Sequence, residues 1–274
     1  MVEALEQIFG QSPSVFADLE KRTTVASLYL PKVTAQQRTE VRAALTIIRR
    51  AGLEVGSGRI SVRRVPRENW AESWKRHFKP LEISPRLLVI PSWSRRRPKS
   101  GQAVVVLDPG LSFGTGHHPT TAFCLEQLAS LRETGVRQSL LDMGSGSGIL
   151  SIAAAKLGYA PVTGFDFDPD AVRVAKENAV VNGVRIALTR KDLTRLPVRA
   201  ARPAAVVCAN LMYDLLIQER ARILNRLAVG GTLVLAGILK EQFPAVQRAY
   251  EAGGMVIIAQ RAAGEWRSGA FRRR

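Results

Sequence analysis

The chain has 274 residues, 46% of them hydrophobic, with 40 Lys and Arg against 23 Asp and Glu, and its net charge is +17. This apolar content is ample for a packed core, and the length favours one large and one small domain. No apolar run approaches the roughly 18 residues that a membrane span needs, and residues 1–20 carry acids where a signal peptide would be basic and apolar. We therefore expect a cytoplasmic protein without a membrane partner.

Residues 1–65 are predicted to form a small α+β domain. Apolar spacing predicts helices over 2–9 and 34–51, and alternating polarity predicts strands over 23–30 and 59–65. Residues 66–100 hold three of the four tryptophans and a basic cluster. We expect them to be a partly ordered connector.

Residues 101–274 are predicted to form a second, larger domain in which strands and helices alternate. This alternation is typical of an α/β fold with a doubly wound, mostly parallel, seven-stranded Rossmann-like sheet. The predicted strands cover 103–108, 139–144, 160–166, 185–190, 204–210, 232–238 and 255–260, and the predicted helices cover 120–132, 149–158, 169–182, 213–228 and 241–253.

Three glycines spaced by single residues, Gly144, Gly146 and Gly148, join the strand at 139–144 to the next helix. Glycine suits a backbone that must turn sharply or approach a ligand closely, so the loop predicts a nucleotide cradle. The third glycine comes one residue too early for a dinucleotide fingerprint. Asp166 closes the following strand, where an acid would accept hydrogen bonds from ribose hydroxyls. The pattern resembles the class I methyltransferases, which bind S-adenosylmethionine.

Each of these residues also has a structural interpretation. The glycine loop could be a tight turn without a ligand, and Asp166 could cap the next helix, although Asp168 is better placed for that. Asn210, which ends the strand predicted at 204–210, could likewise be a turn residue.

A second glycine-rich segment, LDPGLSFGTGHHPTT at 107–121, precedes the glycine loop. Its density of Gly, Pro and Thr around one phenylalanine predicts a lid that faces a ligand. Phe113, Gly114 and Thr115 lie within it. Thr120 and Thr121 follow at the start of a helix, where their hydroxyls could cap the helix or meet the ligand.

The lid, the glycine loop and the segments 164–184, 207–212 and 236–239 together resemble the ribosomal protein L11 methyltransferase family, over roughly residues 68–267. The resemblance implies a methyltransferase domain behind a small ferredoxin-like module, here shortened by an initial strand. It also implies S-adenosylmethionine as methyl donor, S-adenosylhomocysteine as product, and lysine side-chain or N-terminal amines of ribosomal protein L11 as acceptors. The implied donor-site residues are Thr121, Gly144, Gly146, Asp166 and Asn210, with Phe113, Gly114 and Thr115 of the lid.

Two further roles follow from the resemblance. Asn210 would orient the acceptor amine, since an amide cannot act as a base. His117 would line the acceptor channel, or else be structural; the family's usual motif has threonine at this position. Ser145 stands where the family usually has cysteine, a near-isosteric change that should keep donor binding.

The shortened first domain and the altered segment 212–214 leave two alternatives open. One is a related protein-lysine methyltransferase with a different target. The other is a ribosome- or RNA-binding assembly factor whose donor site is vestigial, for which the +17 charge counts.

The charge itself, with clusters at 95–99 and 272–274, favours anionic surfaces such as ribosomal RNA. No aromatic residues interleave with it, so we expect at most a weak RNA contact. Cys124 and Cys208 sit in apolar segments and are predicted to be buried thiols. Neither they nor the three histidines show metal-ligand spacing, so no metal is expected.

Overall fold

The computed structural model describes residues 2–18, 23–63, 78–108 and 116–273. The chain divides into two compact units, residues 1–68 and 69–274. Each unit is described by itself.

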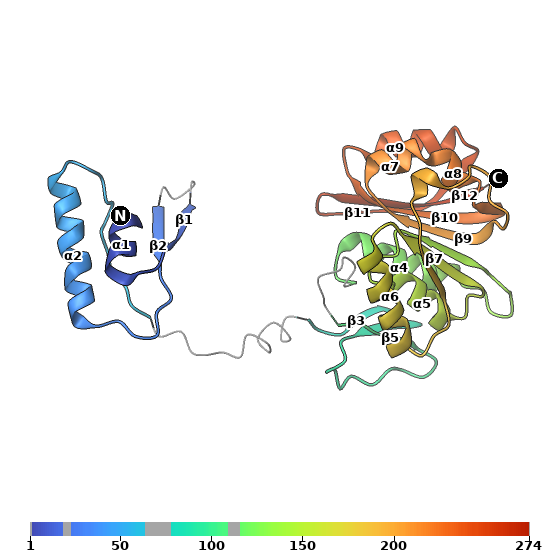
Figure 1. Cartoon of the computed structure of the whole chain (residues 1–274). Coiled ribbons are helices and arrows are strands. Elements are labelled where there is room, and N and C mark those ends of the chain that lie inside the picture. Colours follow the sequence, from blue (N-terminus) through green and yellow to red (C-terminus); the bar gives the residue numbers. More distant parts are fainter. Residues whose placement is uncertain (1, 19–22, 64–77, 109–115, 274) are drawn as a thin grey trace. The chain divides into compact units, whose positions relative to one another are not determined.

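In its described residues, the first unit forms two helices and one antiparallel strand pair (Figure 1). Its elements are α1 (Val2–Phe9), β1 (Ser14–Asp18), β2 (Thr23–Ser27) and α2 (Ala35–Arg50). Helix α2 begins in a capping box, in which Thr34 and Gln37 satisfy each other's backbone N–H groups. β1 was missing from the sequence prediction, and residues 59–63 of the predicted strand 59–65 form no strand. Alternating polarity shows that a segment could form a strand with one buried face. The strand forms only where a neighbouring strand offers backbone groups for hydrogen bonds.

The second unit is built on the expected seven-stranded, mostly parallel sheet, in the order β11-β12-β10-β9-β6-β7-β8. Pairings among β6 to β10 are parallel, and β12 runs antiparallel to both β10 and β11. The strands are β6 (Leu140–Met143), β7 (Val162–Asp166), β8 (Ala187–Arg190), β9 (Ala204–Asn210), β10 (Leu227–Leu239), β11 (Met255–Ala263) and β12 (Trp266–Arg273).

Helices cover both faces of this sheet, with α4, α5 and α6 on one side and α7, α8 and α9 on the other (Figure 1). Each layer encloses its own core of buried apolar side chains. The helix predicted over 213–228 is two short helices that meet at Glu219. The bounds are α4 (Pro119–Leu131), α5 (Ile149–Leu157), α6 (Pro169–Val181), α7 (Tyr213–Gln218), α8 (Arg220–Leu224) and α9 (Phe243–Glu251).

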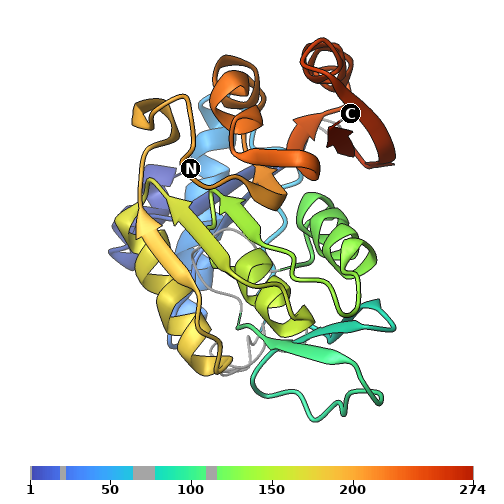
Figure 2. The same ribbon diagram turned by 90° about the vertical axis from the view of Figure 1, so that its right-hand side faces the viewer.

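A three-stranded sheet forms a further layer of the second unit. Its strands are β3 (Leu81–Ser84), β4 (Leu87–Ile90) and β5 (Ala103–Val106), in that order. Leu87 and Val105 are fully buried in one core with side chains of α4 and α5, and Figure 2 shows the small sheet beside these helices.

The small sheet corrects two sequence predictions. Residues 81–90, expected in the connector, are two of its strands, and the strand predicted at 103–108 belongs here, not to the main sheet. The seventh strand of the main sheet is β12, which was not predicted. Apolar runs of four residues look alike whichever sheet they join, because membership is decided by tertiary partners. Trp70 and Trp74 of the connector lie outside the described residues.

Candidate functional site

The glycine loop is a tight turn between β6 and α5. The N–H groups of Gly144 and Ser145 both donate to the Phe165 carbonyl, at 2.9 and 3.0 Å. Gly144, Gly146 and Gly148 have φ of 71°, 50° and 80°, in the left-handed region that favours glycine. The loop thus holds its backbone against the end of β7, at the carboxyl edge where open α/β sheets bind ligands.

Asp166, the last residue of β7, fastens this loop from the side. Its Oδ2 accepts from the Gly146 N–H at 2.8 Å, and its Oδ1 accepts from the Asp168 N–H at 3.0 Å. Asp168 caps α6 by accepting from the Asp170 N–H at 2.9 Å, so the alternative that Asp166 is the cap is wrong. A carboxylate offers about four acceptor positions, so both Asp166 oxygens keep capacity for a ligand's hydroxyls.

Asp142 lies in β6 directly before the loop and is 1% exposed. Its Oδ2 accepts from the Ser151 hydroxyl at 2.8 Å and from the Ser151 N–H at 3.2 Å. Burial raises the pKa of Asp142 to about 6, although these hydrogen bonds act in the opposite direction. Sequence reasoning missed this residue; the signal was an acid inside an otherwise apolar strand that leads into the glycines.

Three buried side-chain oxygens, in the first turn of α4, in β6 and in the glycine loop, have no hydrogen-bond partner among the described residues: Thr121 Oγ1, Asp142 Oδ1 and Ser145 Oγ. Thr121 lies in the first turn of α4, one turn before Cys124, and Asp142 is close enough to Cys124 to add to the effect of burial in raising the pKa of that thiol. An unpaired buried polar group costs about 1–3 kcal/mol. Two hydroxyls and a carboxylate left in this way are suited to a small ligand with charged ends.

Asn210 ends β9 at the same carboxyl edge, next to Ala236 of β10. The following residue of β10, Gly237, has φ of 82° and lies at a register shift in the strand. A Cβ at Gly237 would lie 2.5 Å from the Leu211 carbonyl oxygen and 3.1 Å from Asn210 Oδ1. Gly237 therefore leaves the space in which Asn210 and the chain after it are placed. Sequence reasoning missed this role.

The two histidines before α4 have different surroundings. His117 is exposed, contacts the Phe78 ring edge-on at 5.6 Å, and lines a shallow cavity with Phe78, Val89 and Leu107; Asn210 is not among the residues lining it. His118 is the N-cap of α4, and its Nδ1 lies 2.7 Å from Thr120 Oγ1. The prediction that Thr120 or Thr121 caps this helix is wrong, because the helix begins one residue before them, at Pro119.

The lid residues Phe113, Gly114 and Thr115 lie outside the described residues. Over the described ranges, no group of three or more His, Cys, Asp and Glu side chains could hold a metal ion. No helix in that same part of the chain is long and apolar enough to cross a membrane. Cys124 and Cys208 are buried free thiols, as predicted.

The family model for ribosomal protein L11 methyltransferase (PrmA) matches residues 4–274. The chain belongs to this family. The resemblance read from the lid and the glycine loop is thereby confirmed, and S-adenosylmethionine is the methyl donor that the family uses.

Several relatives belong to the same L11 methyltransferase family, and one of them matches nearly the whole chain. The ribosomal protein L11 methyltransferase of Trichlorobacter lovleyi is 44% identical over 212 residues, which cover 75% of this chain and 68% of that protein. The one from Syntrophotalea carbinolica is 39% identical over 260 residues, covering 93% and 83%. In the relative from Geobacter sulfurreducens, the matched part is 64% of the protein's length. The crystal structure of a ribosomal protein L11 methylase from Lactobacillus delbrueckii subsp. bulgaricus superposes with a TM-score of 0.63 at 30% identity, covering 72% of this chain and 100% of that one.

Proposed function

We propose that this chain transfers methyl groups from S-adenosylmethionine to lysine side-chain amines, N-terminal amines or both in ribosomal protein L11. The observation that carries the proposal is the glycine loop held by Asp166, together with three buried oxygens that lack a partner among the described residues. The relatives are named ribosomal protein L11 methyltransferases. A cytoplasmic location goes with a ribosomal substrate.

The residues around the loop fit the donor. The remaining acceptor positions of Asp166 would take the two ribose hydroxyls, and the open backbone at Gly144 and Gly146 would lie along the methionine portion. The unpaired oxygens of Thr121, Ser145 and Asp142 would meet its charged amino-acid end. Phe113, Gly114 and Thr115 are proposed to cover it. When bound, the donor supplies a methyl group on a positively charged sulfur, which is a good leaving group.

The protein's task is then mainly to align and to exclude water. An acceptor lysine, with an ordinary pKa of about 10.4, must lose its proton before its lone pair can attack. A pocket of low dielectric beside a cationic sulfur lowers that pKa. Asn210 is proposed to orient the amine through its side-chain oxygen, and His117 to line the approach of the acceptor. We assign no general base, so the proton passes to water.

The test is intact-mass spectrometry of recombinant L11 incubated with this chain and S-adenosylmethionine. Mass gains in whole methyl units are expected, and peptide mapping then locates the amines. No mass gain in L11 despite tight donor binding would point to a different protein target. The observation that motivates this alternative is the two-stranded sheet of the first unit. Absence of donor binding would favour an assembly factor with a vestigial site.

The ribose assignment has its own test. Asp166→Asn keeps the volume but removes the charge, and donor affinity should fall by about 1–3 kcal/mol, roughly five- to 150-fold in Kd by calorimetry. The matched control is Asp170→Asn, an exposed carboxylate on α6 that pairs with Arg173. Unchanged affinity in Asp166→Asn, or an equal loss in the control, would contradict the assignment.

A second proposed partner is ribosomal RNA, for which the motivating observation is the +17 charge.

A further inference from the structure

Six of the basic residues of the second unit lie in one segment, which begins at the outermost strand of its sheet. Residues 185–202 contain six basic residues and one acid, a net +5 of the chain's +17. The segment runs along β8, the outermost strand, and the loop that leads from it toward β9. All six basic residues are exposed; they are Arg185, Arg190, Lys191, Arg195, Arg199 and Arg202. We call this surface the basic edge.

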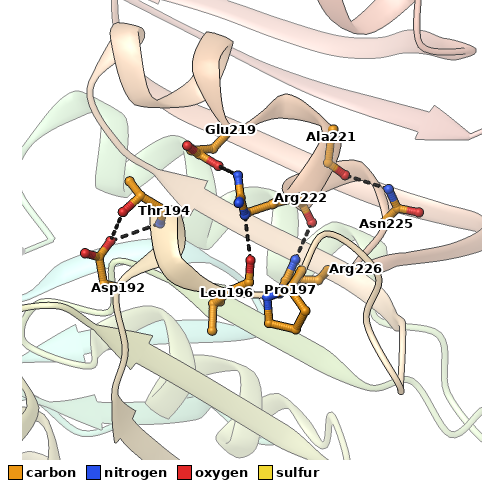
Figure 3. A network of polar contacts seen from close by, with 9 residues as sticks. All are labelled: Asp192, Thr194, Leu196, Pro197, Glu219, Ala221, Arg222, Asn225 and Arg226. Atoms are coloured by element: carbon orange, nitrogen blue, oxygen red, sulfur yellow. Dashed lines mark hydrogen bonds and ion pairs between the residues drawn. The ribbon is translucent and has the colours of Figure 1, made fainter.

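Two arginines, one in α8 and one just after it, hold the loop of the basic edge by donating to its backbone carbonyls (Figure 3). Arg222 of α8 donates through Nε to the Leu196 carbonyl at 2.6 Å and pairs with Glu219 at 2.6 Å. Arg226 donates to the Pro197 carbonyl at 2.9 Å and to the Arg222 carbonyl at 2.7 Å. Asp192 adds a short helical turn by accepting from Thr194.

Holding the loop in this way costs free energy, because it buries a cation. Arg226 is only 6% exposed, and burial, followed by the neighbouring charge of Arg222, lowers its pKa. Buried cations cost several kcal/mol unless they are well paired, and Arg226 has carbonyls where Arg222 has a carboxylate. Such an arrangement orders the backbone that displays the exposed cations, which lowers the entropy lost when a partner binds.

Protection of the sheet edge is the simpler explanation, because charged side chains on an outer strand prevent pairing with other chains. It accounts for Arg190, the one basic residue within β8, and for Arg185 just before it. It does not account for Lys191, Arg195, Arg199 and Arg202, which follow the strand where no edge remains to be protected.

The cluster at 95–99 is a weaker candidate for the same role. Arg96 and Lys99 both pair with Glu82, so part of its charge is already neutralised. In the basic edge, the one acid, Asp192, makes a 3.4 Å pair with Arg195 and leaves the other five cations without an acidic partner in the described part of the chain.

We propose that the basic edge is a docking surface for the phosphate backbone of RNA. Spaced, exposed arginines on a fixed backbone suit a polyanion, and the absence of aromatic side chains among them predicts binding without base stacking or sequence preference. A basic protein such as a ribosomal protein would be repelled by this surface. This inference rests on the proposed function in one respect only, namely that the RNA would be ribosomal RNA.

The experiment measures binding of a fluorescein-labelled oligouridylate to the full chain by anisotropy, over about 50 to 200 mM salt. The test variant is Arg195→Gln/Arg199→Gln/Arg202→Gln. The control is Arg95→Gln/Arg97→Gln/Arg137→Gln, which removes the same charge from exposed positions elsewhere. Three lost phosphate contacts should lower the slope of log K against log salt by about 2 and weaken binding about 100-fold at 0.1 M salt, with little effect in the control.

Equal weakening in both variants would overturn the proposal, as would a wild-type chain that does not bind. Competition by polyglutamate at equal charge concentration would also overturn it, since the surface would then favour acidic protein as much as RNA. Methylation of free L11 is measured separately, without RNA, with the same three protein preparations. The rate of methylation should be the same for the wild type and both variants. If the wild type does not methylate L11, the proposed function is contradicted, whereas the conclusion on RNA binding is unaffected.

Discussion

Asp142→Asn should change how the stability of this protein depends on pH. In the folded chain the Asp142 carboxyl holds its proton up to about pH 6, whereas in the unfolded chain it loses it near 3.8. Between these values the folded state binds more protons, so stability falls as pH rises through this window. The difference corresponds to about 3 kcal/mol above pH 6. Asparagine is neutral throughout and does not incur this cost.

Urea unfolding of both proteins, without methyl donor, measures the effect. Near pH 4 the two should have similar free energies of unfolding, and by about pH 7.5 the asparagine variant should be more stable by up to about 3 kcal/mol. Asp170→Asn, an exposed carboxylate, is the control and should show no such trend. A difference between Asp142→Asn and wild type that stays constant from pH 4 to 8 would refute the reasoning. Added donor should narrow the gap, because its ammonium group would lie near the ionised carboxylate.

Two further substitutions test the packing beside the site. Gly237→Ala places a Cβ 2.5 Å from the Leu211 carbonyl at φ of 82°, so we expect a loss of about 2–4 kcal/mol in urea unfolding together with weaker donor binding; a neutral result would mean that this backbone is free to shift. Tyr250→Phe removes the hydroxyl that donates to the Leu216 carbonyl at 2.9 Å in a fully buried position, and should cost about 1–3 kcal/mol without changing donor affinity. Loss of donor binding in that variant would show that α9 and the site are coupled.

The helices beside the site were predictable from sequence because their ends carry local signals. Asp168 and Pro169 mark the start of α6, and Gly158 marks the end of α5 with φ of 92°. The glycine loop and the acid after it are likewise local patterns. Their spacing was enough to predict a donor site, whose individual contacts remain proposals.

What sequence reasoning missed depends on partners distant in the chain. Val105 and Leu140 both lie in short apolar strands, yet β5 joins the small sheet and β6 the large one. The role of Gly237 becomes visible only when Leu211 is packed against it. Asp142 was missed because its burial and its unpaired oxygen depend on residues packed around it, such as Ser151 of α5.

The position of β12 has a consequence for the order in which the protein is built. This strand is later in sequence than every other strand that the structure describes, yet it lies inside the sheet, between β10 and β11. In the described sheet β11 pairs with β12 alone, so until residues 266–273 are available β11 has no place and β10 keeps an open edge. During synthesis the sheet can close only after residues 266–273 have left the ribosome, and until then β10 presents an edge that could pair wrongly.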